Sequence, residues 1–183
     1  MYKFPKHSLK YKLDDEYMTP LYAFNGLFEY IQLDKSTKIW EPFFGDGGSV
    51  QKIQKIGYEQ VHAENVNFFE CTPPDKDTMI VTNPPFSIKK QVLDHIINVL
   101  KWPRFALLLP VCVLFTRYFH DILAKRGDIE IEILVPYSRI QFLKNGKAPG
   151  KCSFDSCWIV SGVQLGKTKK GYHFLPPWTT KEL

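Results

Sequence analysis

The sequence predicts a single α/β domain with a mostly parallel central sheet and helices on both faces. Short apolar runs, which are typical of buried strands, alternate with segments that have the hydrophobic spacing of helices. The run at residues 105–110 contains no polar residue, as expected for a central strand covered on both faces. Two other runs end in glycine-rich or proline-rich turns, where open α/β sheets bind ligands. The length of 183 residues suits one domain, residues 1–183, with a sizeable core.

The composition is that of an ordinary globular protein, with 44% hydrophobic and 23% charged residues. No apolar run approaches a membrane-spanning length, so we expect no membrane partner, and residues 1–6 lack the apolar stretch of a signal peptide. The four cysteines show no paired spacing for a metal such as zinc. We therefore expect reduced thiols in an intracellular protein of the cytoplasm or nucleus. The net charge of +5 and the pI near 8.9 favour a polyanionic partner only mildly.

The chain begins with a basic arm, which is followed by a helix. Residues 1–13 mix lysines with aromatic residues, and they form either a solvated arm or an arm along a phosphate backbone. Thr19 can then cap a helix that has Pro20 at its first position. The apolar residues of this helix recur on one face: Leu21, Phe24, Leu27, Phe28 and Ile31.

A first buried strand is expected at residues 38–44, followed by a glycine turn at residues 45–48 and a helix at residues 49–56. Glycines let backbone amides approach a ligand closely, so this order is typical of a nucleotide cradle. The spacing is neither that of the dinucleotide fingerprint nor that of a phosphate loop. Glu41, which heads the turn, disfavours a phosphate-rich ligand and suits one that carries a cationic amine.

A second strand, at residues 60–64, ends in the carboxylate of Glu64. This residue lies about twenty positions after the glycine turn, where Rossmann-like folds place an acid on ribose hydroxyls. Its position favours a role in ligand binding, and an exposed glutamate without a ligand is the alternative.

The sequence Asn83-Pro84-Pro85-Phe86, here named the Pro-Pro turn, lies between an apolar run and a helix start. The two prolines fix φ, remove two backbone donors and push the preceding residue toward extended geometry. The result is a stiff turn with free carbonyls, one amide side chain and one aromatic ring. This set suits a planar group with an exocyclic amine, whose hydrogens can go to the Asn83 side-chain oxygen and the Pro84 carbonyl. A strand-ending turn with a buried phenylalanine is the alternative.

The second half of the chain continues the alternation of strands and helices. We expect helices at residues 88–101 and 113–126, and strands at residues 105–110, 129–135 and 156–160. The loop at residues 136–155 is either a surface hairpin or a loop that grips nucleic acid. In the second case three basic residues would contact phosphates: Arg139, Lys144 and Lys147. For the basic tail around residues 167–178 we expect a solvated stretch.

In these motifs the chain resembles the S-adenosylmethionine-dependent amino-methyltransferases, especially the N6-adenine DNA methyltransferases of phage and viral type. Four pieces match in the family's order. They are Tyr17-x-Thr19-Pro20, Glu41-Pro42-Phe43-Phe44-Gly45-Asp46-Gly47, the acid Glu64, and the Pro-Pro turn. The stretch Arg139-Ile140-Gln141-Phe142-Leu143 is also similar to a segment of viral and phage members, and the resemblance spans most of residues 14–163.

The resemblance implies a Rossmann-like class I methyltransferase fold with one antiparallel C-terminal strand, and S-adenosylmethionine as cofactor. It implies these cofactor-binding residues: Tyr17, Thr19, Pro20, Glu41, Pro42, Phe43, Gly45, Gly47, Glu64, Asn65, Phe68 and Asn83. The catalytic residues would be Asn83, Pro84, Pro85 and Phe86, with Phe86, Arg139, Lys144 and Lys147 on the substrate. Asn67 departs from the pattern, since many relatives carry Asp at that position beside the cofactor's adenine.

The activity implied is methyl transfer to the N6 amine of adenine in DNA. An RNA adenine, a protein glutamine, or a non-catalytic cofactor-binding subunit are the alternatives. The chain is short, so we expect modest selectivity, read by the 136–155 loop or supplied by a partner subunit or a second copy.

Overall fold

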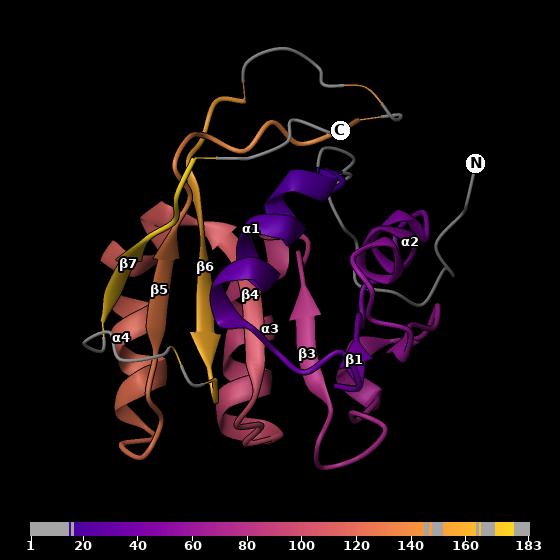
Figure 1. Cartoon of the computed structure of the whole chain (residues 1–183). Helices are drawn as coiled ribbons and strands as arrows, with labels where there is room; N and C mark the ends of the chain where they lie inside the picture. Colours follow the sequence, from indigo (N-terminus) through magenta and orange to yellow (C-terminus); the bar gives the residue numbers. More distant parts are fainter. Residues whose placement is uncertain are drawn as a thin grey trace.

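The structure is a computed structural model, and it describes residues 15, 17–144, 147, 152–163, 165 and 171–177. The predicted arm at residues 1–13 lies outside this part, and the 136–155 loop lies partly within it. In the described part, seven strands form one sheet in the order β2-β1-β3-β4-β6-β5-β7 (Figure 1). They are β1 (Ile39–Trp40), β2 (Val61–His62), β3 (Met79–Thr82), β4 (Phe105–Pro110), β5 (Glu132–Val135), β6 (Ser156–Ser161) and β7 (Tyr172–Phe174).

The sheet is mixed but mostly parallel. β1 pairs in parallel with β2 and β3, and β3 pairs in parallel with β4. β6 runs antiparallel between β4 and β5. The predicted fold class, with a mostly parallel sheet and one antiparallel strand near the C-terminus, is therefore confirmed.

The helices cover both faces of this sheet (Figure 1). They are α1 (Leu21–Ile31), α2 (Gly48–Lys55), α3 (Lys89–Asp94) and α4 (Arg117–Ala124), with short helical turns η1 (Phe68–Glu70), η2 (Phe86–Ile88), η3 (His95–Val99) and η4 (Val111–Phe115). Alternate residues of each strand divide between two cores: Met79 and Val81 pack with α1 and α2, whereas Ile80 packs with α3 and α4. Burial on both faces explains why the central strands are apolar throughout.

β7 corrects the prediction of a solvated tail, because residues 172–174 form a strand in parallel with β5. Tyr172 and Phe174 are exposed, whereas His173 is buried. The His173 ring lies 2.8 Å from a Glu132 carboxylate oxygen through Nε2 and 2.9 Å from the Tyr30 hydroxyl through Nδ1. A buried polar group needs such partners, and the sequence pattern alone does not show them.

Several element boundaries also differ from the predicted ones. Pro20, not Thr19, is the N-cap of α1, and no side chain accepts a capping hydrogen bond there. The predicted helix at residues 113–126 is η4 followed by α4, because Thr116 stops the first and caps the second by accepting from the Phe119 amide. The predicted helix at residues 88–101 is likewise a succession of η2, α3 and η3. None of the helices in the described part combines the length and apolarity needed to cross a membrane.

Candidate active site

The carboxyl ends of β1, β3 and β4 lie at one edge of the sheet, because these strands are parallel neighbours. Glu41 follows β1 directly, and Asn83 follows β3 directly. Two motifs that are far apart in the sequence therefore begin side by side. A hydrogen bond from the Thr82 hydroxyl to Glu41 Oε1 connects them.

Glu41 is a buried carboxyl whose hydrogen bonds come from its own turn and from β3. Its Oε1 accepts from the Thr82 hydroxyl and, at 3.1 Å, from the Phe43 amide. Burial raises the pKa of Glu41 to about 8, and the two hydrogen bonds oppose this shift only in part. The carboxyl is therefore largely protonated at neutral pH until a cation lies beside it.

The amide of Asn83 has one satisfied end and one open end. Its Nδ2 donates to the Tyr17 carbonyl at 2.8 Å. Its Oδ1 is buried, and no described residue donates a hydrogen bond to it. The reverse orientation would bring two oxygens together, so the Tyr17 carbonyl determines which end stays open. An unpartnered buried acceptor costs about 1–3 kcal/mol, which makes it a marker of a ligand site.

Thr19 supplies a second open polar group near this edge. Its hydroxyl is buried and has no hydrogen-bond partner among the described residues, instead of capping α1 as predicted. It lies two residues after Tyr17, which holds Asn83. Three prolines adjoin Thr19, Glu41 and Asn83 in the sequence, and all three are buried: Pro20, Pro42 and Pro84. Their rings fix the local backbone.

The glycine turn has left-handed backbone at two of its glycines. Gly45 has φ of 57° and Gly47 has φ of 78°, values that favour glycine. A Cβ at Gly47 would lie 3.1 Å from the Phe44 ring, and one at Gly45 would lie 3.3 Å from Met18 Sδ. The turn thus packs closely against its own ring and against the segment before α1, and it leads into α2.

Glu64, Asn65 and Phe68 follow β2, and they differ in exposure. Glu64 and Asn65 are exposed, with Glu64 Oε1 3.6 Å from His62 Nε2. Phe68 is only 2% exposed, and its ring centre lies 5.0 Å from that of Phe43. Glu64 and Asn65 can contact a ligand directly, whereas Phe68 is buried and its ring packs against that of Phe43.

Asn67 has a local structural reason to be Asn. Its Oδ1 accepts from the Phe69 amide at 3.3 Å, and its Nδ2 donates to Glu70 Oε1 at 2.7 Å. An ionised Asp could make the first bond but would repel Glu70. The departure from the family pattern therefore caps η1.

Phe86 belongs to a cluster of four aromatic rings that joins the Pro-Pro turn to the 136–155 loop. The Phe86 ring meets Phe142 and Phe154 edge-on, with ring centres 6.0 and 5.3 Å apart. Tyr17 meets the same two rings at 6.2 and 5.8 Å. Sequence reasoning assigned no role to Phe154 or Thr82. Thr82 could have been found from its place directly before Asn83, but Phe154 has no comparable signal.

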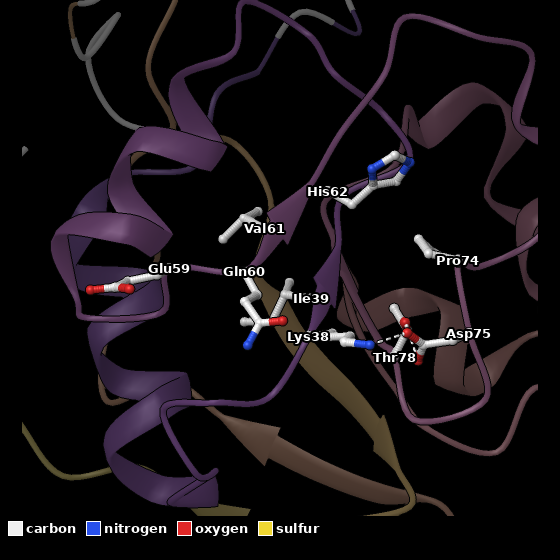
Figure 2. A pocket seen from close by; sticks show the side chains of 9 residues that line it. All are labelled: Lys38, Ile39, Glu59, Gln60, Val61, His62, Pro74, Asp75 and Thr78. Carbon is white, nitrogen blue, oxygen red and sulfur yellow. Dashed lines mark hydrogen bonds and ion pairs between the residues drawn. The ribbon is translucent and has the colours of Figure 1, made fainter.

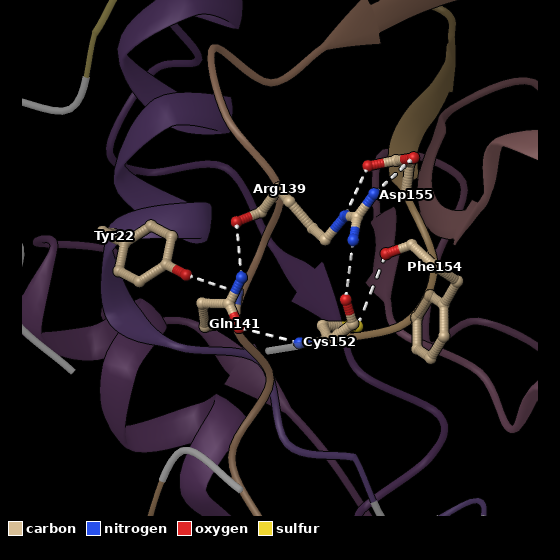
Figure 3. A network of polar contacts seen from close by, with 6 residues as sticks. All are labelled: Tyr22, Arg139, Gln141, Cys152, Phe154 and Asp155. Carbon is tan, nitrogen blue, oxygen red and sulfur yellow. Dashed lines mark hydrogen bonds and ion pairs between the residues drawn. The ribbon is translucent and has the colours of Figure 1, made fainter. Parts of the chain in front are cut away.

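Arg139 holds the 136–155 loop together (Figure 3). Its guanidinium pairs with both carboxylate oxygens of Asp155, at 2.7 and 3.1 Å, and donates to the Cys152 carbonyl at 2.9 Å. This pairing lowers the pKa of Asp155. The Gln141 amide donates to the Tyr22 hydroxyl at 2.7 Å, which ties the same loop to α1. A phosphate contact by Arg139, as expected above, would have to compete with Asp155.

The two predicted substrate lysines lie beyond this network. Lys144 and Lys147 face each other in an antiparallel bridge, with backbone N–O distances of 2.8 and 3.2 Å. Lys147 is exposed, and Lys144 Nζ lies 5.9 Å from the centre of the Tyr17 ring. The structure therefore brings Lys144 next to the Tyr17 ring of the aromatic cluster, whereas Arg139 is paired with Asp155.

A hollow of about 340 Å³ lies elsewhere, beside β1 and β2 (Figure 2). Its lining includes Lys38 and Asp75, whose charged groups are 2.5 Å apart, and Thr78. Lys38 precedes β1 and Thr78 precedes β3, so this end of the hollow lies at the amino ends of the strands. Because parallel sheets bind ligands at their carboxyl ends, we place the candidate site at Glu41 and Asn83 instead.

No family model and no curated protein matches this sequence. Solved structures, however, have similar folds. A modification subunit assigned to a type I restriction enzyme of Vibrio vulnificus YJ016 is 13% identical, with a TM-score of 0.57 over 93% of this chain and 49% of that chain. This chain thus spans about half the length of that subunit.

Two further structures give the same result. A protein of Listeria monocytogenes assigned to the class I S-adenosylmethionine-dependent methyltransferases is 14% identical, with a TM-score of 0.56 over 96% of this chain and 70% of that chain. The 23S rRNA methyltransferase ErmE is 13% identical, with a TM-score of 0.54 over 77% and 67%. Together with the strand order, these likenesses show that the chain has the Rossmann-like fold of class I methyltransferases.

Proposed function

We propose that this protein is an S-adenosylmethionine-dependent methyltransferase that acts on the N6 amine of adenine in DNA. The observation that carries the proposal is the buried, unpartnered Oδ1 of Asn83. Asn83 belongs to a proline-fixed turn at the carboxyl edge of the sheet. The residue before it, Thr82, donates a hydrogen bond to the Glu41 carboxyl. The fold supports the cofactor, since proteins that share it are methyltransferases of this class.

The residues at the edge suit this cofactor in their charge and their hydrogen-bonding groups. The open Thr19 hydroxyl and the buried Glu41 carboxyl suit its amino acid portion, with Tyr17 and the backbone of the glycine turn beside them. Glu64 and Asn65 are exposed where ribose hydroxyls would bind, and Phe43 over Phe68 offers an apolar wall for an adenine ring. The cofactor, when bound, supplies an electrophilic methyl group on a sulfonium.

The Pro-Pro turn would prepare the target nitrogen for direct displacement. Asn83 Oδ1 and the Pro84 carbonyl accept the two hydrogens of the amine, which localises its lone pair. With the cofactor bound, the nitrogen would form a bond to the methyl carbon while the carbon–sulfur bond broke. The positive charge that develops on nitrogen is stabilised by the same two oxygens, and the nitrogen then loses one proton to water. This sequence requires no metal and no covalent enzyme intermediate.

Exposed aromatic and basic groups at this edge favour a nucleic acid over a protein substrate. Phe115 is 83% exposed after β4, and Tyr137 is 64% exposed after β5. The Arg117 side chain is 94% exposed, with its Nε 3.6 Å from an Asp121 carboxylate oxygen, and Lys147 is exposed as well. Aromatic rings stack on unpaired bases, and cations contact phosphates. A target base in a duplex must leave the stack, at a cost of a few kcal/mol, and stacking on Phe86 would offset about 1–3 kcal/mol of that cost.

RNA is the second candidate substrate, and it is favoured by the fold shared with a 23S rRNA methyltransferase. The test is transfer of tritiated methyl groups to single-stranded DNA, duplex DNA, RNA and a glutamine-containing protein in parallel, followed by nucleoside analysis. We expect N6-methyl-2′-deoxyadenosine from the DNA substrates, and loss of this product in Asn83→Ala. The matched control is Asn25→Ala, which removes a half-buried amide on α1. Cofactor binding without transfer to any substrate would favour a non-catalytic subunit and contradict the proposal.

A further inference from the structure

The segment before α1 lies between the Pro-Pro turn and the 136–155 loop, and it bonds to both. Tyr17 accepts from the Asn83 side chain at 2.8 Å, and Asp15 Oδ2 accepts from the Ser87 amide at 3.1 Å. On its other side, Met18 exchanges two backbone hydrogen bonds of 2.8 Å with Leu143. We name this segment, residues 15 and 17–19, the clasp.

We propose that the clasp is a positioning device, in which the Tyr17 carbonyl orients the Asn83 amide and makes Asn, not Asp, the required residue. The geometry carries this inference. A carbonyl oxygen can only accept, so it selects the NH₂ end of the amide and turns Oδ1 the other way. Oδ1 is the atom that lies buried with no hydrogen-bond partner in the part of the chain that the structure describes. The catalytic consequence rests on the proposed function, whereas the orientation does not.

The Tyr17 carbonyl is itself held in place. Its peptide neighbour Met18 is bonded through both backbone groups to Leu143, and the Tyr17 ring packs edge-on against Phe142 and Phe154. The amide of Asn83 is thus connected through the clasp to the loop that carries Lys144, one residue after Leu143.

An ionised Asp at position 83 would have no hydrogen to donate. One of its oxygens would face the Tyr17 carbonyl oxygen, and the two would repel each other. A protonated carboxyl could instead donate its O–H to that carbonyl. Asn83→Asp therefore needs protonation to restore the contact. Both burial and the adjacent carbonyl favour the protonated form.

The first experiment observes the orientation directly in the ligand-free full chain. The side-chain NH₂ signals of Asn83 are assigned by their absence in Asn83→Asp, and their exchange with water is measured by nuclear magnetic resonance. We expect exchange at least about tenfold slower than for Asn25. Met18→Pro removes the Met18 amide from the Leu143 bond, and it should abolish this protection. Exchange of Asn83 as fast as that of Asn25 would overturn the proposal.

The second experiment measures the proton requirement. The affinity of Asn83→Asp for S-adenosylhomocysteine should stay within about threefold of wild type. Its methyl-transfer rate should fall about tenfold for each unit of rising pH between pH 6 and 8. Asn25→Asp should follow the wild-type profile. An Asn83→Asp activity that is independent of pH would contradict the proposal. The wild type could show no methyl transfer to any substrate while the Asn83 side-chain NH₂ still exchanges slowly with water. In that case the proposed function fails and the positioning role stands.

Discussion

Glu41 and Asn83 occupy equivalent positions at the ends of their strands, but their side-chain oxygens differ in hydrogen bonding. Each directly follows one of two neighbouring parallel strands. Glu41 Oε1 accepts two hydrogen bonds and the pKa of the Glu41 carboxyl is raised, whereas Asn83 Oδ1 has no donor among the described residues. The difference teaches that one edge of a sheet can present two groups that respond to different properties of a ligand. Glu41 should respond to the charge of a ligand, and Asn83 should respond to its hydrogen-bond donors.

The largest expected effect comes from removing the open acceptor. Asn83→Ala should lower the methyl-transfer rate by about 100-fold or more, the scale seen when one preorganised polar group of a transition state is removed. Affinity for S-adenosylhomocysteine should stay within about threefold, measured by calorimetry. Equal losses of rate and affinity would make Asn83 structural and would remove the contrast with Glu41.

Glu41→Gln tests the charge response of the other corner. Binding of a cationic amine favours the ionised carboxylate, so wild-type affinity should rise about tenfold per pH unit below pH 8 and level off above it. Glu41→Gln should bind about 10–100-fold more weakly at pH 8, with little pH dependence. Calorimetric titrations between pH 6 and 9 measure both. A pH-independent wild type would show that the carboxyl does not meet the ligand.

The stability of the ligand-free protein gives an independent check on Glu41. Its pKa lies above the ordinary value of 4.5, so the folded state binds more protons than the unfolded state between these values. This contribution to stability is fully present below about pH 4.5 and is lost as the pH rises through about 8. Thermal unfolding should therefore show a falling melting temperature from pH 6 to 9 in the wild type, and a weaker fall in Glu41→Gln.

Phe86→Ala sharpens the role of the Asn83 corner. Loss of base stacking, worth about 1–3 kcal/mol, should lower kcat/KM for the nucleic acid by about tenfold. Phe86→Tyr keeps the ring and should retain most activity. Cofactor affinity should not change in either variant, and a large change would mean that the aromatic cluster of Tyr17, Phe142 and Phe154 has collapsed.

The smallest effects should separate the two kinds of basic residue in the 136–155 loop. Lys147→Ala should weaken nucleic acid binding about twofold to threefold and reduce the slope of affinity against salt by about one unit. Arg139→Ala should leave that slope unchanged, because Arg139 is paired with Asp155. Filter binding at several salt concentrations checks both. A reduced slope in Arg139→Ala would show that phosphate displaces Asp155.

The sequence was sufficient to predict the features that follow from local rules. The strand at residues 105–110, the glycine turn that leads into a helix and the proline-fixed turn after β3 are all confirmed. These depend on burial, backbone φ and proline geometry, which a few adjacent residues determine. The meeting of the Glu41 and Asn83 turns also followed, because parallel strands share a carboxyl edge.

The remaining features depend on contacts between distant segments. Thr19 has the residue type of a cap, yet Pro20 takes that position and the hydroxyl stays open. Arg139 has the residue type of a phosphate ligand, yet Asp155 lies sixteen residues away in the chain and pairs with it. β7 forms because His173 finds partners on α1 and β5. Only the folded arrangement shows such partners.

α1 is fastened at both ends by tyrosine hydroxyls, and this has a mechanical consequence. Near its start, Tyr22 accepts from the Gln141 amide, and near its end Tyr30 bonds to His173 of β7. Tyr30 lies eight positions after Tyr22, a separation of about 12 Å along the helix. The helix is therefore a rigid connection between β7 and the 136–155 loop. Tyr30→Phe should remove its contact with His173, and faster amide exchange at Gln141 would show that the two ends are coupled.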